Sequence, residues 1–175
     1  MKNMIIILLV CIIIWIIYEF NNLISLKKKV ERAESVVDVF LKKRFDLIPN
    51  LVETVKGYVQ YEQDTLKNII VMRNNYMNTH SIEDGKKLTE DYKKVLAIAE
   101  ALPTLKASEN FLNLQKELSK VESEIQAARR IYINEITNFN TKIETIPYNL
   151  FAKILGYKIV EYPELIYDEV KINFD

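Results

Sequence analysis

An uninterrupted apolar segment at residues 4–18, almost at the N-terminus, constrains this chain more than any other feature. The segment reads MIIILLVCIIIWIIY and carries no charge, whereas the sequence that follows it is rich in charged residues. A membrane-spanning helix needs about 20 apolar residues. Lys2 on one side of the segment, with Trp15 and Phe20 on the other, suits the two membrane interfaces. We therefore predict a transmembrane anchor over residues 1–20, with the lipid bilayer as a partner.

A cleaved signal peptide and a lipoprotein signal are the two alternatives for this segment. A signal peptide needs small residues at its cleavage site, and the stretch WIIYEFNNL contains none. A lipoprotein signal would use Cys11, but the preceding Val10 is not small and six more apolar residues follow. An uncleaved anchor is the favoured interpretation.

Basic residues beyond the segment predict its orientation. Lys2 stands alone on the N-terminal side, whereas Lys27, Lys28, Lys29 and Arg32 follow the segment. Because cytoplasmic flanks carry an excess of Lys and Arg, we predict a single-pass protein of the cell membrane with a short outside N-terminus and a cytoplasmic body. The basic cluster is interpreted either as a solvated helix face or as a group that attracts anionic lipid.

The composition excludes several classes of protein. The chain has 24 basic and 24 acidic residues, so no net field draws it to nucleic acid, and we expect no nucleic-acid partner. Three glycines and four prolines in 175 residues are too few for the many turns of an all-β fold. About 155 residues follow the anchor, which is the size of one domain.

Apolar residues at heptad spacing continue directly from the anchor. We call the following residues the heptad stripe: Leu23, Leu26, Val30, Ala33 and Val37. With Phe40 they alternate steps of three and four, which predicts one helix over residues 4–47. The stripe has no obvious partner within the chain, so we predict that it is the contact of a homo-oligomer.

The rest of the chain also shows helical periodicity. Pro49 predicts either a kink or a break, and a kink is favoured because no turn residues surround it. Apolar spacing predicts helices over residues 51–72, 88–102, 111–146 and 149–155. Residues 74–85 read as a loop in which Ser81 and Asp84 form a capping box, and Ser108 is a predicted N-cap.

These patterns predict an all-α fold. The transmembrane helix continues into an antiparallel bundle of three to four long helices, since each helix has an apolar face that needs a partner. The predicted bundle domain covers residues 21–156, and residues 157–175 form a short extended C-terminal tail. Gly57, inside a predicted helix, is interpreted as a point of close helix approach.

Three stretches of the sequence resemble the LemA family. They are RFDLIPNLVETVKGYVQYE at residues 44–62, ASENFLNLQKELSKVE at 107–122 and RRIYINEITNFNTKIETIPYNLFAKILGY at 129–157. The resemblance covers essentially the whole chain. The chain departs from the family at Glu34, where the family usually has tryptophan, and at Tyr132-Ile133 and Phe139-Asn140, where it usually has Tyr-Asn.

The resemblance implies a single-pass bacterial membrane protein with a short outside N-terminus and a helical bundle. It does not imply a mechanism, because the molecular function of the family is not established. Some relatives are tied to magnetosome membranes, which points toward membrane organisation.

Polar residues close to the apolar faces form the best candidate site. The predicted network or ligand cluster consists of Arg44, Asp46, Asn50 and Glu53 around Pro49, with Arg129, Arg130 and Asn134 on the last long helix. If these helices pack together, Arg129 or Arg130 could meet Asp46 or Glu53. A network that fixes helix register is favoured over a ligand pocket. The only histidine, His80, lies in the polar loop, so we predict no metal site, no cofactor and no catalytic residues.

Two hypotheses of function follow from the sequence. The first is a membrane-anchored scaffold or adaptor that self-associates at the membrane or binds an unknown protein partner. The second is a ligand-sensing or regulatory domain that uses the polar cluster near Pro49. Intrinsic enzyme activity is not expected.

Overall fold

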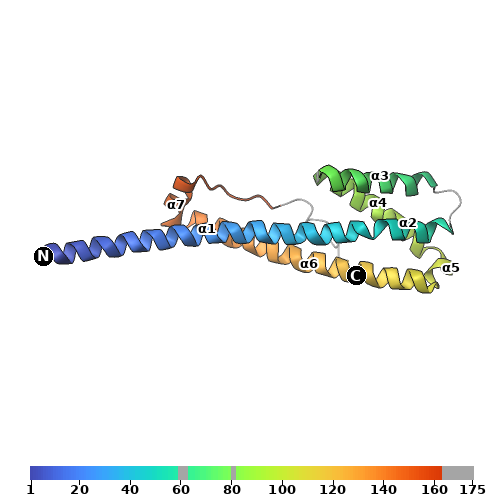
Figure 1. The fold of residues 1–175 in the computed structure, drawn as a ribbon, viewed down its shortest axis with the longest axis horizontal. Coiled ribbons are helices and arrows are strands. Elements are labelled where there is room, and N and C mark those ends of the chain that lie inside the picture. Colours follow the sequence, from blue (N-terminus) through green and yellow to red (C-terminus); the bar gives the residue numbers. More distant parts are fainter. Residues whose placement is uncertain (59–62, 80–81, 163–175) are drawn as a thin grey trace, which may run out of the picture. The chain divides into compact units, whose positions relative to one another are not determined.

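The computed structural model describes residues 1–58, 63–79 and 82–162 (Figure 1). These residues form seven helices: α1 (Lys2–Asp46), α2 (Ile48–Lys56), α3 (Gln63–Thr79), α4 (Ile82–Glu100), α5 (Pro103–Lys106), α6 (Glu109–Glu144) and α7 (Tyr148–Leu155). The described part of the chain contains no strand. Four of the helices, α1, α3, α4 and α6, are 17 residues or longer. The prediction of an all-α fold built from long helices is therefore confirmed.

The chain is divided into two compact units. The described residues of the first unit are 1–37 and 128–162, and those of the second unit are 38–58, 63–79 and 82–127. The first unit contains the N-terminal part of α1, the C-terminal part of α6, and α7. The second unit contains the other parts of α1 and α6 together with α2, α3, α4 and α5. The boundaries drawn from the sequence at residues 20 and 156 remain predictions.

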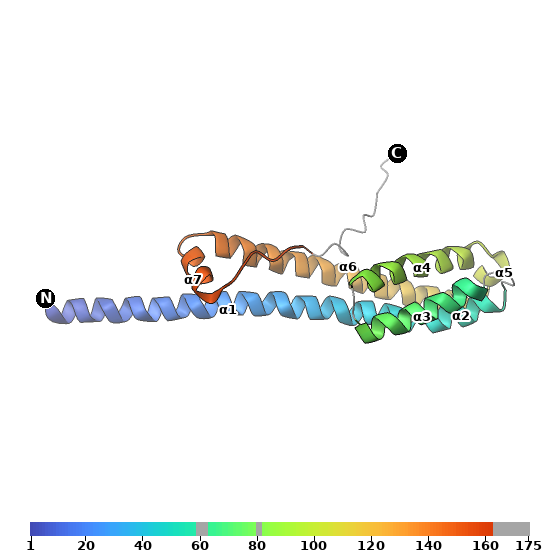
Figure 2. The same ribbon diagram turned by 90° about the horizontal axis from the view of Figure 1, so that it is seen from above.

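In the first unit, α6 runs beside α1 in the opposite direction (Figures 1 and 2). Leu23, Val30, Ala33 and Val37 of the heptad stripe are buried, and Leu26 is half-buried. Buried residues of α6 in the same unit are Ala128, Tyr132, Ile136, Phe139, Asn140 and Ile143. The premise that the stripe lacks a partner within the chain is therefore wrong, because its side chains are buried in a single copy.

The apolar segment at residues 4–18 is exposed, in contrast to the heptad stripe. Almost all of its large side chains are among the exposed hydrophobic residues of the chain. The helix that begins at Lys2 is long and apolar enough to cross a membrane, with a mean hydropathy of 2.5 in its most apolar 18-residue window. Only 6% of that window is buried, whereas the core helix of a soluble protein is mostly buried. The segment is thus a candidate membrane span by length and composition.

In the second unit, the single residue Leu47 separates the end of α1 from the start of α2. Leu47 keeps helical backbone angles, with φ −84° and ψ −11°, and Pro49 lies in the first turn of α2. Proline is tolerated there because the first helical N–H groups have no intrahelical acceptor. The favoured interpretation of Pro49 as a kink agrees with this geometry.

Helix α3 and helix α4 cover most of the segment predicted to be a loop. Residues 74–79 belong to α3 and residues 82–85 to α4, so the loop prediction is wrong for these residues. The physical reason is tertiary: Tyr76 is 5% exposed and packs edge-on against Phe45, with ring centroids 4.9 Å apart. A Cβ atom on Gly85 would lie 3.0 Å from the Tyr76 ring, so the glycine makes room for it. Ser81, and with it the predicted capping box, lies outside the described residues.

Two helix ends follow local signals read from the sequence, whereas α2 ends at Lys56, inside the single helix predicted over residues 51–72. The Phe111 N–H donates to Ser108 Oγ at 3.3 Å, which confirms the predicted N-cap of α6. Gly156 ends α7 in the left-handed conformation, with φ 68°. Gly57 is different, because it caps the end of α2 and a Cβ atom there would meet nothing within 4 Å. The interpretation of Gly57 as a point of close helix approach is therefore wrong.

Candidate functional site

The residues of the predicted polar cluster are divided between the two units. Arg44, Asp46, Asn50 and Glu53 belong to the second unit, and Arg129, Arg130 and Asn134 to the first. The predicted pairing of Arg129 or Arg130 with Asp46 or Glu53 would join the units and stays a prediction. Within the second unit, Asp46 pairs with Arg73 and Arg44 pairs with Glu122.

Arg44 is the most buried charged side chain of this set, with 3% of its surface exposed. It donates one hydrogen bond to Thr89 Oγ1 at 2.8 Å and another to Glu122 Oε2 at 3.2 Å. Its guanidinium group also stacks on the rings of Phe45 and Tyr92, at 5.0 Å and 5.6 Å from the centroids. A planar guanidinium suits this combination of stacking and directed donation. These contacts join α1, α4 and α6, so we expect Arg44 to hold the register of these helices.

Arg73 of α3 donates a hydrogen bond to the backbone carbonyl group that Pro49 leaves without its helical donor. Proline has no N–H, so it cannot donate to the Phe45 carbonyl four residues earlier. Arg73 Nε donates to that carbonyl oxygen at 3.2 Å, and its Nη2 atom pairs with Asp46 Oδ1. Sequence reasoning missed Arg73, although the missing donor at Pro49 signals that some other group must satisfy the Phe45 carbonyl.

A surface depression of about 300 Å³ lies where α2 meets the start of α6. Its polar lining residues are Asn50, Glu53, Thr54, Asn110, Asn113 and Glu117. A second depression of about 270 Å³ shares Glu53, Thr54 and Asn110 with it and adds Tyr58 and Ser108. The lining offers carboxylate and amide groups and no basic side chain, which suits a cation or a ligand rich in hydrogen-bond donors. Two of the predicted cluster residues, Asn50 and Glu53, thus line a common surface.

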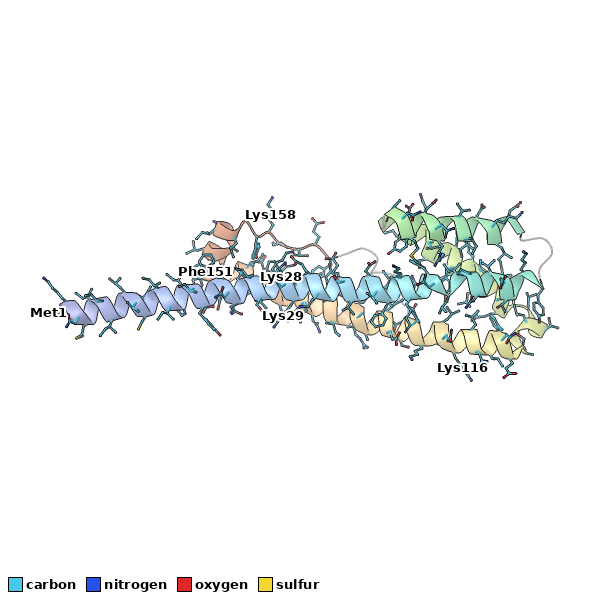
Figure 3. All side chains as sticks on the ribbon, viewed as in Figure 1. Met1, Lys28, Lys29, Lys116, Phe151 and Lys158 are labelled. Atoms are coloured by element: carbon cyan, nitrogen blue, oxygen red, sulfur yellow. The ribbon has the colours of Figure 1, made fainter. Side chains whose placement is uncertain are left out.

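In the first unit, α7 packs against α1 where the apolar segment ends (Figure 3). The Phe151 ring lies 6.3 Å from that of Trp15 and 4.9 Å from that of Phe20, measured between centroids. The Tyr148 hydroxyl donates to Glu19 Oε2 at 2.6 Å, and Glu19 is only 8% exposed. A carboxylate beside an apolar segment is costly unless it is hydrogen-bonded. Sequence reasoning did not predict this contact, because the partners are far apart in the chain.

The chain after α7 is held against α6 by a pair of hydrogen bonds. Asn140 Nδ2 donates to the Val160 carbonyl and the Val160 N–H donates to Asn140 Oδ1, both at 2.9 Å. The hydroxyls of Thr137 and Tyr162 lie 2.9 Å apart and share a further hydrogen bond. Asn140, which keeps the asparagine of the Tyr-Asn pair usual in the family, therefore holds residues 157–162 in place.

Replacing Asn140 with alanine is expected to release Val160. Both hydrogen bonds disappear together, which costs about 1–3 kcal/mol of local stability. Hydrogen exchange of the Val160 amide should accelerate by about fivefold or more, the factor that corresponds to about 1 kcal/mol, while exchange in α3 and α4 stays unchanged. Asn140→Asp is the matched control, because its carboxylate still accepts from the Val160 N–H. Equal exchange rates in both variants and the parent chain would show that the pair does not hold this segment.

Tyrosine burial predicts a loss of stability at alkaline pH. Burial, reinforced by the Glu34 carboxylate that accepts its hydrogen bond, raises the pKa of Tyr132 to about 12. In the unfolded chain the pKa of tyrosine is about 10. Between these two pKa values the unfolded state releases the tyrosine proton and the folded state keeps it. The contribution of Tyr132 to the free energy of unfolding is therefore fully present below about pH 10, and it is lost as the pH rises to about 12.

The measurement is urea unfolding of the first unit at pH 8, 10 and 11, followed by hydrogen exchange in residues 128–144 of α6. Tyr132→Phe should flatten the alkaline decline in that unit. Burial also raises the pKa of both Tyr76 and Tyr92 to about 12, so the second unit should decline in the same pH range in either chain. An unchanged slope for Tyr132→Phe would contradict the assignment.

These features describe a helical protein whose first helix is a candidate membrane span. The sequence model of the LemA family matches residues 33–174. The chain belongs to the LemA family. The matched region contains the polar residues around Pro49 and all of α6 and α7, and it begins after the candidate span.

Curated relatives agree with this assignment. The chain is 29% identical to Protein LemA of Metamycoplasma hominis over 140 residues, which cover 77% of the chain and 64% of that relative. It is 20% identical to Magnetosome proteins MamQ 1 and MamQ 2 of Paramagnetospirillum magneticum over 188 aligned positions, with 87% of the chain and 67% of each relative covered. The chain thus spans a little under two thirds of the length of the Metamycoplasma relative.

Proposed function

We propose that this protein is a membrane-anchored helical scaffold or adaptor. The observation that carries the proposal is the exposure of the apolar segment, whose most apolar window is only 6% buried. Lipid is the environment that removes such a surface from water. The helix that carries this segment continues into the folded units without a linker, since α1 is unbroken from Lys2 to Asp46. The proposed role is to hold a helical surface close to a membrane.

The proposed topology has the N-terminus outside the cell membrane and the two units in the cytoplasm. The support is the basic residues of α1 that follow the segment, because such residues are enriched on the cytoplasmic side. The proposed role does not involve catalysis, which agrees with the fact that the LemA family is not a known family of enzymes.

Cysteine labelling in intact cells tests the anchor and its orientation. In a Cys11→Ser background, Asn3→Cys should react with a membrane-impermeant thiol reagent, and Ser119→Cys should react only after lysis. Both positions are exposed, so failure to react does not reflect burial. The chain should stay in the membrane fraction at alkaline pH. Labelling of Ser119→Cys in intact cells would reverse the orientation, and recovery in the soluble fraction would refute the anchor.

Self-association in the membrane is the form of scaffolding that we propose. An anchor confines copies to one plane and raises their effective concentration. Since most of the heptad stripe is buried within one chain, a contact between copies needs exposed positions such as Val36, which is 45% exposed. Cysteine crosslinking at Val36 should give dimers, whereas the buried Val30 should not. Absence of dimers at Val36 would leave a monomeric adaptor.

A ligand-sensing domain is the second candidate, supported by the depression that Asn50 and Glu53 line. Its carboxylate and amide groups suit short polyamines. A short polyamine should then raise the melting temperature of the chain, and Glu53→Gln combined with Glu117→Gln should abolish the rise. Equal rises in both chains would exclude this depression as the site.

A further inference from the structure

Helix α7 has one face that the chain buries and one that it leaves exposed. Phe151 and Ala152 are buried against the rest of the first unit. Leu150 and Ile154 are 59% and 73% exposed, and Ile146, just before the helix, is 83% exposed. Leu150 and Ile154 are four residues apart, so they lie on one side of the helix, and Ile146 precedes the helix. A group of exposed large apolar side chains marks a candidate contact with an apolar environment outside the chain.

The contacts of α7 show which part of α1 lies next to it. Phe151 packs against Trp15 and Phe20, the aromatic residues at the end of the apolar segment (Figure 3). Tryptophan is enriched where a spanning helix passes from hydrocarbon to headgroups. Both views show α7 beside the part of α1 from which the apolar segment extends (Figures 1 and 2). Helix α7 therefore lies beside the end of the candidate membrane span of α1.

The short length of the apolar segment strengthens this placement. Residues 4–18 extend about 22 Å as a helix, whereas the hydrocarbon core of a bilayer is about 30 Å thick. A short span draws the interface toward the residues that flank it. Those residues include Glu19, whose carboxylate accepts the Tyr148 hydroxyl bond, and Phe20, which Phe151 covers. Thus α7 shields the one charged group closest to the span.

Charges around α7 match a lipid surface. Lys153 is exposed on α7, and Lys142 lies over the Tyr148 ring at 3.6 Å from its centroid. Exposed Lys158 follows the helix, as Figure 3 shows. Lysine side chains extend to headgroups while their stems lie along apolar surface. An interfacial helix combines such residues with bulky apolar ones on its other face.

We propose that α7 is an interfacial membrane helix, with Ile146, Leu150 and Ile154 inserted into the bilayer surface where α1 leaves it. The inference rests on the proposed membrane anchoring and deepens it. Two attachments, one spanning and one lying in the interface, fix the rotation of α1 about its own axis. They thereby determine which face of the first unit is turned toward the membrane.

Depth measurements on the full chain in lipid vesicles test the inference. Single cysteines in a Cys11→Ser background carry an environment-sensitive fluorophore, and vesicles of phosphatidylcholine and phosphatidylglycerol contain a spin-labelled quencher lipid. Leu8→Cys reports the span, Ile154→Cys reports α7, and Ile131→Cys is the matched control. Ile131 is 56% exposed in the same unit, but it lies on α6, 17 residues along the chain before α7 begins at Tyr148. Lipid should quench the labels at positions 8 and 154 at least twofold, and the label at 131 hardly at all.

The labels at positions 8 and 154 test the membrane anchor and the interfacial position of α7 separately. Quenching at position 8 with an aqueous label at 154 overturns the α7 inference alone. No quenching at position 8 overturns the anchor, and the inference with it. An apolar but unquenched label at 154, with crosslinking between chains, means that a second copy covers α7 and overturns the inference.

A second variant keeps the test independent of the label. Leu150→Gln with Ile154→Gln changes only exposed positions, so the unit should stay folded and remain bound to vesicles through α1. A label at Ile146→Cys should then lose at least half of its lipid quenching. Unchanged quenching in this background would also overturn the inference.

Discussion

Replacing Val30 with aspartate is expected to unfold the first unit. Val30 is 1% exposed within a single chain, and an unpaired carboxylate at such a position is strongly unfavourable. The loss should exceed about 4 kcal/mol, in the range where one substitution abolishes a unit. Hydrogen exchange in residues 128–144 and 148–155 should become fast, as measured in detergent on the full chain.

Val36→Asp is the matched control for this experiment. Val36 lies on the same helix and in the same unit, but it is 45% exposed, so the change should cost less than about 1 kcal/mol. If the heptad stripe were an interface between copies, Val30→Asp would instead dissociate oligomers and leave each chain folded. A folded Val30→Asp chain would therefore contradict the intrachain packing of the stripe.

Replacing Arg44 with alanine is expected to destabilise the second unit by about 3 kcal/mol. The change removes the hydrogen bonds to Thr89 and Glu122 and empties the space between Phe45 and Tyr92. Urea unfolding followed by hydrogen exchange in α4 should show the loss, because Thr89 ties that helix to Arg44.

The neighbouring Lys43 supplies the control. Its ammonium group also pairs with a glutamate of α6, Glu124, at 2.8 Å, but the lysine side chain is 49% exposed. An exposed ion pair contributes between about 0 and 1 kcal/mol, so Lys43→Ala should have a small effect. Equal losses for the two alanine variants would mean that burial does not distinguish the pairs, and that Arg44 does not fix helix register.

The candidate site was predictable only as far as its residue types were. Arg44, Asp46, Asn50 and Glu53 were identified because polar residues next to apolar faces need partners. Their partners were not identified, since Arg73, Thr89 and Glu122 carry no local signal of the contacts they make. Arg73 is the clearest case: Pro49 reveals that the Phe45 carbonyl lacks a donor, but only the packing of α3 selects the donor.

The sequence by itself determined that the chain is helical, and it marked a few of the helix ends. Apolar spacing, Ser108 and Gly156 act within a few residues of the places they mark, so one-dimensional reasoning reaches them. The apolar segment likewise follows from composition alone. Tertiary structure decided what each helix face touches: α6 covers the heptad stripe, Tyr76 keeps residues 74–79 helical, and Tyr148 reaches Glu19. These contacts join residues far apart in the chain, and an apolar face shows that burial is required without showing which partner provides it.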